Sequence, residues 1–140
     1  MKLDLKPVPN LPSVQAALKL DPQDSGAHQA LGMVLKQKND AEGAAAQFRQ
    51  ADSLNKEKMN VQAATLTTNT GARQLREGDA QGALEKFRAA SKLAPDYAPA
   101  HYQMGLALLK TGKIQEARAE FEKAHQLDPR LRAPHGSGGP

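Results

Sequence analysis

The chain has no cysteine and no tryptophan, and it has only three phenylalanines and two tyrosines. Without cysteine, a disulfide framework, a thiol nucleophile and a Cys-ligated zinc site are excluded. No stretch approaches the 18 apolar residues of a membrane-spanning helix, and the N-terminal MKLDLKPVPN lacks the apolar core of a signal peptide. We therefore expect a soluble protein without membrane contacts, of either the cytosol or the periplasm.

The excess of one charge sign over the other is also small. The 19 basic and 15 acidic residues leave a net charge of +4, which is too small to indicate a polyanionic partner. Alanine, in contrast, fills 24 of the 140 positions. Because alanine has the highest helix propensity and lets helices approach closely, the composition predicts an all-α chain, and the length fits one domain.

Three segments of the chain align with one another, first at a spacing of 39 residues and then at a spacing of 34. The aligned positions hold a glycine, an alanine and a phenylalanine: Gly32, Gly71 and Gly105; Ala44, Ala83 and Ala117; Phe48, Phe87 and Phe121. All three phenylalanines therefore occupy one repeat position, which indicates an internal repeat.

Each unit has the pattern of two helices joined by a tight turn. Ala83, Phe87 and Ala90 follow a helical period, and short polar turns are predicted at 38–40, 77–79 and 111–113. Asp40 and Asp79 are suited to cap the second helices. The units close with SLNK (53–56), KLAP (92–95) and QLDP (126–129), and in the last two of these motifs a proline stops the helix.

This pattern resembles the tetratricopeptide repeat, a helix–turn–helix unit of 34 residues. The units are 25–58, 64–97 and 98–131, and the last matches best, at Met104, Gly105, Leu108, Gly112, Ala117, Phe121, Ala124 and Pro129. The resemblance implies antiparallel helix pairs stacked into a right-handed superhelix, an α-solenoid. The departures are Lys56 in place of proline, Thr70 and Gln74 at apolar positions, and His28, Thr67 and His101 in place of an early aromatic residue.

Two packing relations are expected within this repeat. The glycine of each first helix should face the alanine of its second helix, so that the two helices approach closely. Each phenylalanine should fill the gap between its own unit and the next.

The ends of the chain depart from whole repeats. Residues 1–24 hold a tail and a half-repeat, with a capping helix at about 12–20, and the prolines before it prevent a preceding first helix. This half-unit is either a native cap or the edge of a segment cut from a longer array, and we favour the second reading. Residues 132–140 are expected to be a flexible tail. The exposed face of the last helix is a candidate surface for self-association.

Residues 59–63 are the five extra residues of the wider spacing. Asn55 is a plausible N-cap, and Met59, Ala63 and Leu66 continue the apolar face of the following helix. The insertion is therefore expected to lengthen the first helix of unit 64–97 at its N-terminus by about 7.5 Å. A loop is the alternative, but no Gly or Pro occurs from 44 to 70.

Nothing in the sequence supports catalysis, a cofactor or a metal. The four histidines are not paired at helical spacing, and His28 and His101 hold equivalent repeat positions, which favours a packing role. Glu116 and Glu120, with Arg118 and Lys123, are expected to form a solvated helix face.

The resemblance instead places function on a concave groove lined by the first helices. The corresponding residues are Gln29, Met33, Lys36 and Gln37; Thr65, Thr68, Asn69, Ala72 and Arg76; Tyr102, Gln103, Leu106 and Lys110. Such a mixture suits an extended or helical peptide, with Tyr102 as the strongest anchor. A subclass of the family clamps a carboxylate terminus, but of the positions involved (Gln29, Met33, Asn69, Pro99 and Gln103) only Asn69 matches, so that ligand is disfavoured.

The resulting hypothesis is a non-enzymatic scaffold for protein–protein interaction. The alternatives are an accessory domain of a larger enzyme or assembly factor, and an RNA-binding helical repeat, which the modest charge disfavours. Basic residues near the ends of the first helices, such as Lys36, Arg76 and Lys110, have two readings. They either attract an acidic partner or complement the helix dipoles, and we favour the second reading.

Overall fold

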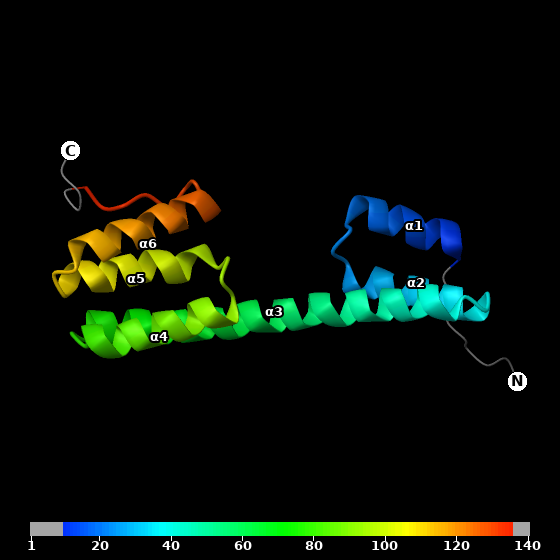
Figure 1. Ribbon diagram of the computed structural model, residues 1–140, viewed down its shortest axis with the longest axis horizontal. Helices are drawn as coiled ribbons and strands as arrows, with labels where there is room; N and C mark the ends of the chain where they lie inside the picture. Colours follow the sequence, from blue (N-terminus) through cyan, green and yellow to red (C-terminus); the bar gives the residue numbers. More distant parts are fainter. Residues whose placement is uncertain (1–9, 136–140) are drawn as a thin grey trace, which may run out of the picture. The chain divides into compact units, whose positions relative to one another are not determined.

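The computed structural model describes residues 10–135, which form six α-helices and no strand. The helices are α1 (Leu11–Leu20), α2 (Ser25–Gln37), α3 (Ala41–Arg76), α4 (Ala80–Leu93), α5 (Ala98–Lys110) and α6 (Ile114–Leu127) (Figure 1). The chain divides into two compact units, and the boundary between Lys58 and Met59 lies inside α3. The all-α prediction is confirmed, and α1 lies where a helix at about 12–20 was expected. Residues 1–9 and 136–140, which include most of the predicted tails, lie outside the described residues.

The three predicted helix–helix turns are confirmed, and all close in the same way. Asn39, Gly78 and Gly112 have positive φ angles of 63°, 94° and 78° at equivalent repeat positions. In each turn the next backbone N–H donates to a carbonyl five residues earlier: Asp40 to Leu35 (2.9 Å), Asp79 to Gln74 (2.8 Å) and Lys113 to Leu108 (2.9 Å). This geometry satisfies a free carbonyl at the end of the helix, and it favours glycine or asparagine.

The predicted aspartate caps are also confirmed. Asp40 Oδ1 accepts a hydrogen bond from the N–H of Gly43, and Asp79 Oδ1 accepts one from the N–H of Gly82, each at 2.9 Å. These carboxylates satisfy N–H groups that have no partner inside the helix. The helices α4 and α6 then end two residues before Pro95 and Pro129, as the sequence predicts.

The helix start predicted at Asn55 is wrong. Asn55 does not cap a new helix, because α3 is one continuous helix of 36 residues that includes SLNK and the whole insertion (Figure 1). The insertion is helical, as expected, but it extends a helix that has not ended. The physical reason is local: with Lys56 in place of proline, the backbone N–H that a proline would remove is retained.

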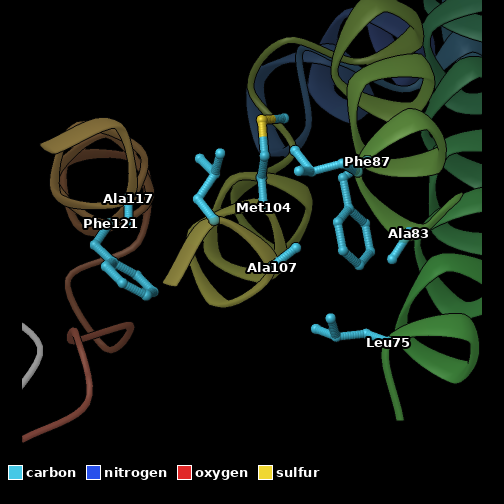
Figure 2. Packing of buried hydrophobic residues seen from close by; sticks show 9 residues of the cluster. Leu75, Ala83, Phe87, Met104, Ala107, Ala117 and Phe121 are labelled. Atoms are coloured by element: carbon cyan, nitrogen blue, oxygen red, sulfur yellow. The ribbon is translucent and has the colours of Figure 1, made fainter. Parts of the chain in front are cut away.

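The core of the second unit surrounds the phenylalanine of α4. Phe87 is fully buried and shares a cluster with Leu75 of α3 and with residues of α5. Figure 2 shows its ring between Ala83 and the α5 residues Met104 and Ala107. The expectation that the phenylalanine fills the space before the next unit is therefore confirmed at Phe87. Phe48, in contrast, is only half-buried.

The expected pairing of glycine with alanine is corrected. A Cβ placed on Gly71 would lie 2.6 Å from the ring of Phe87, and Gly32 and Gly105 meet Phe48 and Phe121 in the same way, at 2.6 and 2.7 Å. Each glycine of a first helix therefore makes room for the phenylalanine of its own second helix. The equivalent alanines are buried nearby, at positions where a small side chain lets the helices pack.

Candidate interaction surface

Two first helices of the second unit, the last part of α3 and all of α5, run side by side in the same direction. Ala64 and Ala100 share one buried cluster, and Leu75 and Leu108 share the other. Since both residue numbers increase together from one cluster to the next, the two helices are parallel neighbours. Their C-terminal ends, at Arg76 and Lys110, lie at the same end of the unit.

Eight of the nine groove residues predicted on these two helices offer surface. Thr65 and Ala72 on α3 are half-buried, as are Tyr102, Gln103 and Leu106 on α5, whereas Asn69, Arg76 and Lys110 are exposed. We call these eight residues the α3–α5 face. The ninth, Thr68, is only 3% exposed, and its Oγ1 has no hydrogen-bond partner in the described chain, so it offers almost no surface to a ligand.

The four groove residues predicted in the first unit lie on α2. They are all exposed: Gln29, Met33, Lys36 and Gln37. Because they belong to a separate compact unit, they are described apart from the α3–α5 face.

The middle of the α3–α5 face is apolar and held in place by the core. Ala72, Tyr102 and Leu106 pack against the cluster around Phe87 and Phe121. The ring of Tyr102 meets the ring of Phe121 edge-on, with centroids 5.4 Å apart and planes at 61°. This arrangement is favourable for two aromatic rings, and it fixes the position of the tyrosine, which remains partly exposed.

Two side-chain amides lie beside this apolar centre. Asn69 on α3 and Gln103 on α5 hold equivalent repeat positions, and neither side chain forms a hydrogen bond within residues 10–135. Each amide has two N–H donors and an acceptor oxygen. Thr65 differs, because its hydroxyl already donates to the carbonyl of Val61 at 2.8 Å.

Cations mark the C-terminal end of the face. Arg76 and Lys110 are both exposed, and neither forms an ion pair within the described part of the chain. Arg130 shows the contrasting situation beyond α6, where its guanidinium lies 2.9 Å from Asp128. That hydrogen-bonded partner lowers the pKa of the Asp128 carboxyl below its ordinary value.

Sequence reasoning assigned His28 and His101 to packing but missed what they connect. In both, Nε2 lies 2.8 Å from the carbonyl oxygen of the proline six residues earlier, Pro22 or Pro95. In both, Nδ1 lies 2.7 Å from a side-chain oxygen 19 residues later, of Gln47 or Glu120. The histidine thus connects the segment that precedes its unit to both helices of the unit.

The signal for this connection is the recurrence of a histidine six residues after a proline. It also corrects the reading of Glu120, which lies against His101 and does not belong to a solvated face. The middle unit has Thr67 at this position, and its hydroxyl donates to the carbonyl of Ala63.

The described residues also bear on metal binding and on membrane spanning. None of their His, Asp and Glu side chains gather in a group of three or more that could hold a metal ion. None of their helices is long and apolar enough to cross a membrane.

The chain is similar to several solved structures, all of them longer. One from Pseudomonas aeruginosa, titled as a functional characterization of pilF, is 24% identical with a TM-score of 0.45, over 84% of this chain and 51% of that one. Two MamA structures are 21% and 22% identical, with TM-scores of 0.47 and 0.44, over 84% and 85% of this chain and 66% and 62% of theirs. The chain thus spans about half the length of the PilF chain. No curated protein matches it.

Family models match most of the repeat region. Models described as tetratricopeptide repeat match residues 25–58 and 98–131, and one described as TPR repeat matches residues 74–112. The chain belongs to the tetratricopeptide repeat family, whose repeats generally serve as non-catalytic scaffolds for protein–protein interaction.

Proposed function

We propose that the α3–α5 face binds an extended or helical segment of a protein partner. The observation that supports this most directly is the pair of unoccupied amides, Asn69 and Gln103, beside an apolar centre. A segment on this face can bury an apolar side chain against Tyr102 and Leu106, while the amides hydrogen-bond to its main chain.

Tyr102 is expected to contribute most to the affinity. Its ring is already fixed by Phe121, so little side-chain entropy is lost on binding. Tyrosines at the centre of an interface are frequent hot spots, whose removal commonly costs about 2 kcal/mol or more. Asn69 and Gln103 then determine the register of the bound segment.

Site-specific photo-crosslinking tests this proposal. A photoreactive amino acid in place of Gln103 should give a covalent adduct with a partner in native extract, whereas one in place of Glu122, on the exposed surface of α6, should not. Replacing Asn69 and Tyr102 by alanine should abolish the adduct.

A double variant of α4, Gln81→Ala with Lys86→Ala, serves as the matched control because both residues are exposed and lie outside the α3–α5 face. It should keep the adduct. Equal adducts from both crosslinker positions, or an adduct that survives the Asn69 and Tyr102 changes, would contradict the proposal.

A further inference from the structure

The acidic residues of the chain avoid every first helix of the repeats. The chain has 15 aspartates and glutamates, yet none lies in α2, in α5 or in residues 59–76 of α3. These segments comprise 13, 13 and 18 residues, and 15 acids spread evenly over 140 positions would place about five among those 44. The cations are present there, at Lys36, Arg73, Arg76 and Lys110.

The helix dipole explains only part of this pattern. It favours cations in the last turn of a helix, where Lys36, Arg76 and Lys110 lie. Its effect is confined to the first and last turns, so it gives no reason to exclude carboxylates from the middle of a helix. The second helices do carry acids at interior positions, such as Glu85 in α4 and Glu120 in α6.

The eight residues of the α3–α5 face therefore include two positive charges and no negative charge. Arg76 and Lys110 lie at the same end of two parallel neighbouring helices, exposed and without an ion pair in the described chain. No carboxylate lies on either helix segment, although the exposed Glu77 directly follows Arg76 in the chain. Exposed cations without an ion pair attract negative charge.

We propose that the segment bound on the α3–α5 face is acidic, with a carboxylate side chain at Arg76 and Lys110 and an apolar side chain at Tyr102 and Leu106. This inference rests on the proposed function and adds the chemistry of the partner. Eight residues of helix separate Tyr102 from Lys110, which is about 12 Å. In an extended segment that distance corresponds to about three to four residues between the apolar and the acidic side chain.

A nucleic acid is the less suitable polyanion. The α3–α5 face has two cations at one end and an apolar centre, whereas binding of a nucleic acid backbone needs basic residues along the whole track. The acidic partner is therefore a peptide or protein segment.

The first experiment is selection of a displayed library of random dodecapeptides on the full chain. We expect the selected peptides to be enriched in Asp and Glu, three to four residues from an aliphatic or aromatic residue. The best peptide, labelled with fluorescein, should then bind at least about tenfold more weakly to the Arg76→Glu, Lys110→Glu variant. Its affinity for the wild type should fall as NaCl is raised from about 50 to 300 mM.

The Arg88→Glu, Lys92→Glu variant is the matched control, since it reverses two exposed cations on α4. It should change the affinity less than about twofold, and circular dichroism should show that both variants stay helical. If the α3–α5 reversal has no larger effect than this control, or if uridine dodecamer RNA binds more tightly than the peptide, the acidic-segment proposal is wrong.

A Tyr102→Ala variant separates this failure from failure of the proposed function. If Tyr102→Ala weakens peptide binding while the Arg76 and Lys110 reversal does not, the α3–α5 face binds the peptide and only its acidic character is refuted. If neither change affects binding, or if no peptide is selected, both proposals are contradicted.

Discussion

The chain passes twice from the second helix of one unit to the first helix of the next, and the two passages differ. After α4, Ala94 and Pro95 end the helix, and the chain returns as α5 to cover Phe87. After Leu54, the chain continues along α3 for another 22 residues. The passage after α4 has a helix breaker, Pro95, whereas the passage within α3 has no glycine or proline from 44 to 70.

The packing positions differ as well. The α5 residues Met104, Ala107 and Leu108 are buried in the cluster around Phe87. One repeat earlier, α3 has Thr70, Arg73 and Gln74 at the equivalent positions. Leu66 is 69% exposed, where its equivalent, Ala100, is fully buried.

A return of the chain at Asn55 would therefore place polar side chains against Phe48, with little apolar burial to stabilise the turn. The comparison shows that stacking of repeats needs both a signal that ends one helix and apolar residues on the next. Where both are missing, the two helices merge.

The largest expected effect is on the two phenylalanines. Phe87→Ala should lower the free energy of unfolding of the second unit by about 3–5 kcal/mol, because it removes a fully buried ring. Phe48→Ala should cost about 1–2 kcal/mol, since its ring is half-exposed. Hydrogen exchange of the amides in each unit measures both values. Equal costs would show that Phe48 is covered as well as Phe87.

The next effect concerns the missing helix breaker. Lys56→Pro should lower the free energy of unfolding by about 3 kcal/mol, because proline removes a backbone hydrogen bond and clashes with the preceding turn. Helical content by circular dichroism should fall as well. Lys56→Ala is the control, expected to be nearly neutral at this exposed position. If the proline variant is as stable as the alanine variant, residues around 56 are not helical.

Glycine replacements should distinguish the same two regions by a smaller amount. Gly71→Ala brings a methyl group against the fully buried ring of Phe87 and should cost about 1–3 kcal/mol. In Gly32→Ala the half-exposed ring of Phe48 can move aside, so the gain in helix propensity, about 1 kcal/mol, should largely offset the clash. Urea unfolding of the two variants tests this difference, and equal destabilisation would contradict it.

The smallest difference in stability is expected between the alanine variants of the two histidines, His101 and His28. His101→Ala removes a ring that is only 4% exposed and leaves the carbonyl of Pro95 and the Glu120 carboxylate without their partner, at a cost of about 1–3 kcal/mol. His28→Ala should cost about 1 kcal/mol or less, because water can replace the half-buried ring. Thermal unfolding measures both. A larger loss at His28 would refute the assigned order.

Much of the fold was predictable because its signals are local. Asp40, Asp79, Gly78 and Pro95 each act on their own backbone neighbours, and the structure bears out their caps, turns and stops. The signal at Asn55 is also local, and for that reason it is ambiguous. Asparagine is common both as an N-cap and on exposed helix surfaces, so its identity alone does not show whether a helix begins.

The decisive information lies far from that residue. Thr70 and Gln74 were recognised as departures from the repeat, but their consequence for stacking appears only when they are compared with Met104 and Leu108 in the structure. The α3–α5 face was likewise predictable only in part. Helical spacing places Asn69 and Arg76 near one surface, whereas the burial of Thr68 depends on how closely neighbouring helices approach.

The most direct test is the backbone conformation in the middle of α3. In one continuous helix, residues 53–60 stay helical and each amide N–H there donates to the carbonyl four residues earlier. The ¹³Cα chemical shifts of these residues should therefore lie in the helical range, and their amides should exchange more slowly than those of the turns at 38–40 and 77–79. If the chain instead turned back at Asn55, residues around this position would leave the helical range. Non-helical shifts at residues 54–58 would contradict the account.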